Sequence, residues 1–148
     1  MAPPSTKTFI NKKEYNIIMG IFIKKNIIKS ISHIAQQSHP KEFIGLLSGK
    51  KEKQDIFIEK LIIPSGGISG KGFASYPIYR SPYNTLGTVH SHPSIPLPSK
   101  ADLNLFSTNG IVHIIIGFPY LLKNIKIYSN DGTEIKEFTI IGEKNERS

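Results

Sequence analysis

Apolar side chains recur along the chain at spacings that first indicate a helix and then a series of strands. After residue 23, apolar residues stand at positions 27, 31, 34 and 35, which form one face of a helix. Pro40 ends this helix, because proline lacks the amide hydrogen that a helix interior needs. Short apolar runs bounded by turn-forming residues follow, and these are typical of strands. We predict strands at residues 43–47, 54–63, 73–79, 86–92, 111–118, 125–128 and 135–141.

Two of these strands carry extra information about their surroundings. Residues 111–118 are almost wholly apolar, as expected of a strand that is buried on both faces. The sequence Asn130-Asp131-Gly132 is a strong turn signal and predicts a hairpin between 125–128 and 135–141. The pattern as a whole predicts an α/β or α+β domain, with a long helix before a mainly β-sheet and a short helix between strands. The other connections are a polar turn, a Gly- and Ser-rich loop and the short helix, at residues 50–53, 64–72 and 99–106.

Length and composition narrow the possible classes of protein. The 148 residues fit one domain, 1–148, in which we expect a loose leader at 1–7 and a loose tail at 143–148. The absence of cysteine excludes disulfides, a Cys-type zinc finger, an iron–sulfur cluster and a thiol nucleophile. The net charge of +8 suits an anionic partner such as an acidic protein. Nucleic acid would also suit this charge, but no motif supports it, so we do not expect it.

The apolar run at residues 15–23 is the strongest candidate for a targeting or membrane segment. Lys24 and Lys25 end it far short of the ~20 residues that a spanning helix needs. A signal peptide would have small residues at a cleavage site after its apolar core, and lysines stand there instead. We therefore predict a cytoplasmic protein without a membrane anchor.

Two histidines and an aspartate form the candidate metal site. His90 and His92 are two residues apart on a predicted strand, so their side chains share one face. Pro93 turns the chain after that strand, and Asp102 follows on the first turn of the next helix. Two imidazoles and one carboxylate leave a tetrahedral ion with one position open for water, which is the arrangement of a catalytic zinc. Taken alone, Ser99 and Asp102 would equally indicate a capping box at a helix start.

A zinc hydrolase also needs a base, and the best candidate is Glu42, which lies between Pro40 and an apolar strand. As an isolated residue it would more simply be a solvated turn glutamate. His113 lies inside the apolar strand at 111–118, where we expect a hydrogen-bonded core histidine rather than a ligand. If it did face the metal, a three-histidine site resembling that of a hydratase would result.

These residues together resemble the signature of the JAMM (MPN+, Mov34/MPN/PAD-1) zinc metalloproteases. The likeness covers residues 23–138 and is greatest to the small single-domain archaeal members. Its specific parts are the sequences PKEFIGLLSG at 40–49, HSHP at 90–93 and SKAD at 99–102. In one respect the chain departs from the family, since five residues separate Pro93 from Ser99 where six are usual.

The resemblance implies a fold, a site and a function. The fold would be a mixed β-sheet flanked by two helices, in the cytidine-deaminase-like group. One zinc ion with a catalytic water would be held by His90, His92 and Asp102, while Glu42 would be the general base and Ser99 would hydrogen-bond the water or the oxyanion. The implied activity is hydrolysis of peptide or isopeptide bonds at the C-terminal tail of ubiquitin or a ubiquitin-like modifier. Two alternatives are trimming of a ubiquitin-like sulfur carrier and a non-catalytic MPN binding module.

Overall fold

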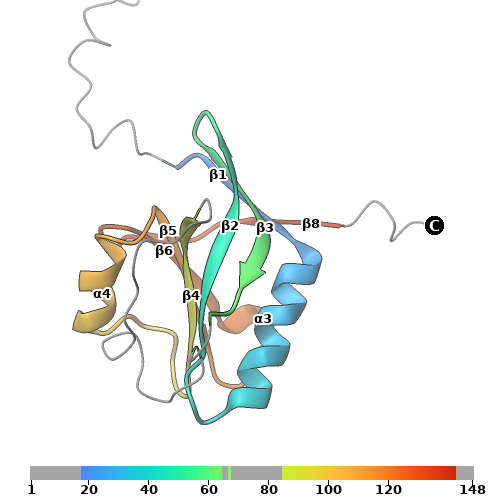
Figure 1. Cartoon of the computed structure of the whole chain (residues 1–148), viewed down its shortest axis with the longest axis vertical. Coiled ribbons are helices and arrows are strands. Elements are labelled where there is room, and N and C mark those ends of the chain that lie inside the picture. Colours follow the sequence, from blue (N-terminus) through green and yellow to red (C-terminus); the bar gives the residue numbers. More distant parts are fainter. Residues whose placement is uncertain (1–17, 65–66, 68–84, 143–148) are drawn as a thin grey trace, which may run out of the picture.

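The computed structural model describes residues 18–64, 67 and 85–142, in which a curled sheet lies between two helices. Helix α3 covers one side of the sheet and the short helix α4 covers the other (Figure 1). None of the described helices is long and apolar enough to cross a bilayer. The elements are, in order, β1 (Gly20–Lys24), α3 (Lys25–Ser38), β2 (Ile44–Glu52), β3 (Asp55–Ile62), β4 (Thr85–His92), α4 (Lys100–Phe106), β5 (Val112–Gly117), the 3-10 helix η2 (Leu122–Asn124), β6 (Ile125–Ser129), β7 (Glu134–Ile135) and β8 (Thr139–Ile141).

The described strands form one mixed sheet in the order β7-β6-β5-β4-β2-β3-β1-β8. The pairs β4/β5, β1/β3 and β1/β8 are parallel, and the other neighbours are antiparallel. The two ends of this order, β7 and β8, are joined by residues 136–138 alone. A link from Ile135 to Thr139 can span at most about 14 Å, so the sheet has to curl until its two edges approach each other. The predicted fold class, a mixed sheet with two flanking helices, is confirmed.

Apolar alternation along the strands produces a separate core on each side of the sheet. The predicted apolar stripe of α3, including Ile27, Ile31 and Ala35, packs into the main core, and the helix ends at Ser38, before Pro40. A smaller cluster on the α4 side consists of Phe106, Ile115 and Tyr128. Strand β5 contributes to both cores and is buried at every position, as its almost wholly apolar sequence predicted.

The first half of the chain contains one strand that was not predicted and one predicted turn that was wrong in its length. The apolar run before the helix ends in strand β1, which the sequence pattern did not separate from the helix that follows. The predicted turn at 50–53 was too long, because β2 continues to Glu52 and pairs there with Asp55 of β3. Strand β2 was expected to end at residue 47. Its pairing with β3 instead continues through an irregular register between Ser48 and Gly49.

The C-terminal hairpin is shorter than predicted. The turn itself is confirmed, since Ser129 N donates to Thr133 O at 2.9 Å and Gly132 takes the φ of +88° that glycine favours. Strand β7, however, contains two residues, and β8 pairs in parallel with β1 at the other end of the sheet order. With this pairing, Phe138 and Ile140 pack against the main core.

Some predicted segments lie outside the described residues. These are the strand at 73–79, the leader at 1–7, the tail at 143–148 and all of the loop at 64–72 except Pro64 and Gly67. The carbonyl of Gly67 accepts a hydrogen bond from Ile44 N at 2.6 Å, which ties this point of the chain to the start of β2.

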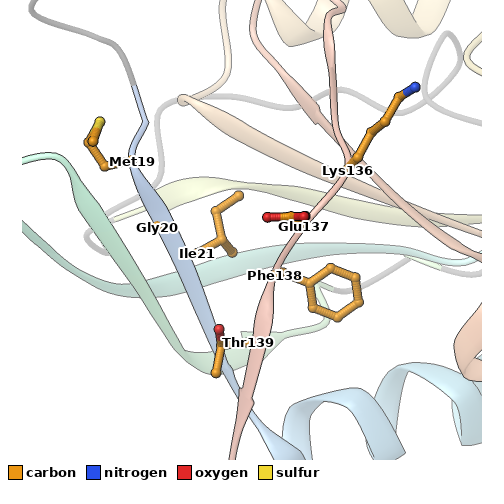
Figure 2. A pocket seen from close by; sticks show the side chains of 7 residues that line it. All are labelled: Met19, Gly20, Ile21, Lys136, Glu137, Phe138 and Thr139. Carbon is orange, nitrogen blue, oxygen red and sulfur yellow. The ribbon is translucent and has the colours of Figure 1, made fainter.

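A pocket of about 480 Å³ lies between the start of β1 and the segment that leads into β8. Its lining includes Gly20 and Ile21 on one side and Lys136–Thr139 on the other, with Glu137 extending toward β1 (Figure 2). Strands β1 and β4 run in the same direction through the sheet. The pocket at the start of β1 is therefore at the opposite end of the sheet from His90 and His92, which lie at the end of β4.

Candidate metal centre

Strand β4 presents His90 and His92 at its C-terminal end, on the face that α4 covers. The side chains of β4 alternate as expected, because Val89, which precedes His90, packs into the main core behind the sheet. The His90 ring lies 6.4 Å from the ring of Phe106, which comes from α4. His90 is fully buried, whereas the His92 side chain is 13% exposed, so solvent reaches this pair from the His92 side.

Helix α4 brings Asp102 to the same place through its N-terminal cap. Ser99 is the N-cap residue, and its Oγ accepts a hydrogen bond from Asp102 N at 3.1 Å. In return, Ser99 N donates to Asp102 Oδ2 at 2.9 Å. The capping box and the metal site were alternative interpretations of these two residues, and the structure combines them. The cap fixes the carboxylate whose Oδ2 also faces the histidines.

Three potential ligand atoms converge at this point from β4 and α4. The Nε2 atoms of His90 and His92 are 3.0 Å apart, and Asp102 Oδ2 lies 3.2 Å from each of them. Ligands at 2.0–2.1 Å around a tetrahedral zinc ion are about 3.3 Å from one another, which is close to all three distances. The donor set of two imidazoles and one carboxylate therefore fits a zinc ion in both chemistry and spacing, and it provides three of the four tetrahedral positions.

The surroundings of the three groups favour a neutral His90 and an ionised Asp102. Burial lowers the pKa of His90 despite the neighbouring carboxylate. Burial opposes ionisation of Asp102, but hydrogen bonds from both histidines and from Ser99 N hold its pKa far below the usual range. The His92 Nδ1 lies 3.3 Å from the carbonyl of Ile95. A hydrogen bond from Nδ1 to that carbonyl orients the ring, and it leaves Nε2 as the ligand atom once Nε2 has lost its proton to bind a metal.

The connection between Pro93 and Ser99 is held against the ends of β5 and β6. Phe118 N donates to the carbonyl of Ser94 at 2.9 Å, and Tyr128 OH donates to the carbonyl of Pro96 at 2.8 Å. Gly117 allows this close approach, because a Cβ there would lie 2.6 Å from Ser94 O. The five-residue connection thus delivers Asp102 to the histidines even though it is one residue shorter than usual.

Glu42 lies beside the triad of ligand residues, His90, His92 and Asp102, and is not itself one of the three. It is half-buried two residues before the start of β2, and its charge interacts with those of His92 and Asp102. Burial raises its pKa above the ordinary value, and the charge of Asp102 adds to this effect while that of His92 opposes it. A carboxylate with a raised pKa next to three ligand atoms takes up a proton more readily than an ordinary glutamate, which suits a general base.

Ser99 is brought close to the triad by the cap, but its oxygen already accepts the amide of Asp102. Its hydroxyl proton can still be donated to a bound group. The predicted site residues are thus placed as a set of three convergent donors, with Glu42 and Ser99 at its edge.

His113 is a core residue, as predicted. Its ring stacks on Phe106 at 4.2 Å, Nδ1 lies 2.7 Å from Thr88 Oγ1 and Nε2 lies 3.2 Å from the carbonyl of Phe106. Both ring nitrogens thus have partners in the smaller core. The three-histidine alternative is not supported, because the group of convergent ligand atoms contains His90, His92 and Asp102.

Two residues near Glu42 were missed by sequence reasoning. Ser91 lies between the histidines, and its Oγ accepts a hydrogen bond from Phe43 N at 3.0 Å. The hydroxyl of Tyr120 lies 2.7 Å from His39 Nδ1, and burial together with the charge of Glu42 raises the pKa of Tyr120. Ser91 could have been suspected from its place in the HSHP sequence, whereas Tyr120 lies three residues after the end of β5 and carries no local signal.

A mixed sheet with a His-His-Asp triad of this geometry defines a zinc site of the metalloprotease type. Residues 24–128 match the family described as prokaryotic homologs of the JAB domain. A Haloferax volcanii protein described as a probable metalloprotease is 32% identical over 115 residues, covering 71% of this chain and 70% of the relative.

Solved structures of the same type superpose on the chain. One, described as a JAMM metalloprotease-like zinc site in the proteasome and signalosome, is 34% identical with a TM-score of 0.63, covering 83% of this chain and 99% of its own. A JAB1/MPN domain protein from Archaeoglobus fulgidus is also 34% identical, with a TM-score of 0.61 and coverage of 82% and 98%. The chain therefore belongs to the JAMM/MPN+ metalloprotease family.

Proposed function

We propose that this protein is a zinc isopeptidase that cleaves bonds at the C-terminal tail of a ubiquitin-like modifier. The observation that carries the proposal is the convergence of His90 Nε2, His92 Nε2 and Asp102 Oδ2, with the ionisable carboxylate of Glu42 beside them. A binding module of the same fold would have no need of this complete set. Family membership supports the metalloprotease class, and the choice of substrate is our extension.

The roles of the chain's own groups follow from their positions. A zinc ion held by the triad would act as a Lewis acid and lower the pKa of its water toward ~7. Glu42 accepts a proton from the attacking water and passes it to the leaving amine, for which its raised pKa is suited. Ser99 donates a hydrogen bond from its hydroxyl group to the developing oxyanion. One such donor typically lowers the activation free energy by about 3–4 kcal/mol.

The proposed partner is recognised by its shape and its charge. The C-terminal tail of such a modifier is extended, so it can pair with a sheet edge as an added strand. The net charge of +8 favours docking of an acidic modifier. Binding that does not weaken as salt is raised would contradict this electrostatic contribution.

The deciding experiment incubates the protein with a panel of ubiquitin-like conjugates, with and without a chelator, and includes Glu42→Gln. We expect chelator-sensitive cleavage by the native protein and none by the variant, while both retain zinc. Undiminished cleavage by the zinc-loaded variant would eliminate Glu42 as the base. Comparison of lysine-linked conjugates with linear C-terminal extensions separates isopeptidase activity from trimming of a sulfur carrier. Absence of zinc from protein purified without a histidine tag would instead favour a binding module.

A further inference from the structure

The hydroxyl of Ser91 connects the strand that carries the histidines to the residue that follows Glu42. Ser91 is fully buried between His90 and His92. Its Oγ accepts a hydrogen bond from Phe43 N at 3.0 Å, and its own N–H donates to the carbonyl of Phe43 at 3.1 Å. These two bonds attach the neighbour of the proposed base directly to the segment between the two histidines.

The bond to the hydroxyl occurs where regular pairing of β2 and β4 stops. Their last paired residues are Ile44 and His90. One position further, an ideal antiparallel pair would exchange two backbone hydrogen bonds. Phe43 and Ser91 make one such backbone bond, and the Ser91 side chain provides the other acceptor. The hydroxyl therefore keeps the chain attached to β4 at the point where Glu42 leaves the sheet.

This attachment matters because Phe43 has no access to solvent. Phe43 is fully buried, so its N–H cannot turn to water if the hydroxyl is removed. The backbone at residue 43 would have to shift to find another acceptor, and Glu42 would move with it. A displacement of about 1 Å at a catalytic group can lower a rate by about 100-fold.

We propose that Ser91 is a positioning residue, whose hydroxyl sets the distance of Glu42 from the group formed by His90, His92 and Asp102. Ser91 acts through the Phe43 amide rather than on the substrate. The inference rests on the proposed function, in which Glu42 is the base, and it adds the residue that holds this base in place.

The kinetic test compares three variants in the zinc-loaded protein. For Ser91→Ala we expect kcat to fall by about 10- to 100-fold, with KM within about twofold and zinc content unchanged. Ser91→Thr retains a hydroxyl acceptor and should recover most of kcat. Thr88→Val is the matched control, because Thr88 is a buried hydroxyl on the same strand that lies 2.7 Å from His113 Nδ1. It should lose stability comparable to that lost by Ser91→Ala while retaining kcat.

Hydrogen exchange provides a readout that needs neither zinc nor substrate. The Phe43 amide should exchange at least about tenfold faster in Ser91→Ala than in the native protein, because its acceptor is gone. The amide of Ile44 donates to Gly67 and should change little. An unchanged Phe43 amide, or a Ser91→Ala variant that loses its zinc, would overturn the positioning role.

The two proposals fail in different ways. Native kcat in Ser91→Ala, together with an inactive Glu42→Gln, would overturn the role of Ser91 and leave the proposed function standing. A fully active, zinc-loaded Glu42→Gln would overturn the proposed base itself, whatever the exchange rate at Phe43.

Discussion

Protonation of His113 should determine much of the acid sensitivity of the fold. The imidazole is fully buried, and burial lowers its pKa from 6.5 to about 3. The unfolded chain therefore takes up a proton near pH 6.5, while the folded protein takes one up only near pH 3. Stability from this residue is complete above pH 6.5 and is lost as the pH falls toward 3.

The size of the effect follows from the two pKa values. Each pH unit between them costs the folded state about 1.4 kcal/mol. Lowering the pH from 7 to 4.5 covers the two pH units between 6.5 and 4.5 in which only the unfolded chain is protonated. His113 should therefore reduce the free energy of unfolding by about 2.7 kcal/mol. This loss is a large fraction of the roughly 5–15 kcal/mol that a domain of ordinary stability has.

Urea unfolding of the metal-free protein at pH 7 and pH 4.5 measures this loss, with His113→Gln as a variant that cannot titrate at this position. Contributions from groups that do not interact with residue 113 are common to both proteins and cancel in the difference, and His90 is the histidine whose charge does act on His113. The native protein should lose about 2.7 kcal/mol more than the variant. Equal losses would refute the reasoning. So would an imidazole NMR signal of folded His113 that titrates near pH 6.5.

Three further predictions concern the site. Asp102→Ala should lower zinc affinity by more than the roughly 10- to 100-fold typical of losing an outer-sphere partner, as measured by competition with a chromophoric chelator. Glu42→Gln should raise the melting temperature of the metal-free protein at pH 8, because burial disfavours the ionised carboxylate; the gain should vanish below pH 4.5, where the glutamate is protonated in both states. A gain that persists there would point to a packing effect. Ser99→Ala should cost about 1 kcal/mol through loss of the cap, and Ser99→Asn should restore stability but not kcat if the hydroxyl donates in catalysis.

The sequence predicted the elements whose periodicity is strong and the groups that share one short segment. The stripe of α3 and the convergence of His90 with His92 follow from periods of 3.6 and 2 residues, and the burial of β5 follows from its almost continuous apolar run. Pairing between distant strands has no comparable signal. Nothing in residues 139–141 indicates that they join β1 rather than the hairpin, because a short apolar strand can pair with either.

Side-chain interactions between distant parts of the chain could not be predicted from the sequence either. The hydrogen bond between His39 and Tyr120 joins residues that are 81 positions apart. The bond between Phe43 N and Ser91 depends on where the pairing of β2 with β4 ends, and this point is decided by the register of the whole sheet. Glu42 could be proposed from its motif, but its half-buried state and the direction of its pKa shift required the structure.

The pairing of β1 with β8 has a practical consequence for any fragment of this protein. The family match runs from residue 24 to 128, so it omits β8 and nearly all of β1, strands that lie beside each other in the sheet. A fragment trimmed to the match would therefore lose both strands together and leave the side of β3 that binds β1 without its partner. Such a fragment would retain His90, His92 and Asp102 and yet present an open strand edge to other copies, which favours aggregation. Boundaries for expression should therefore extend from before Gly20 to beyond Ile141.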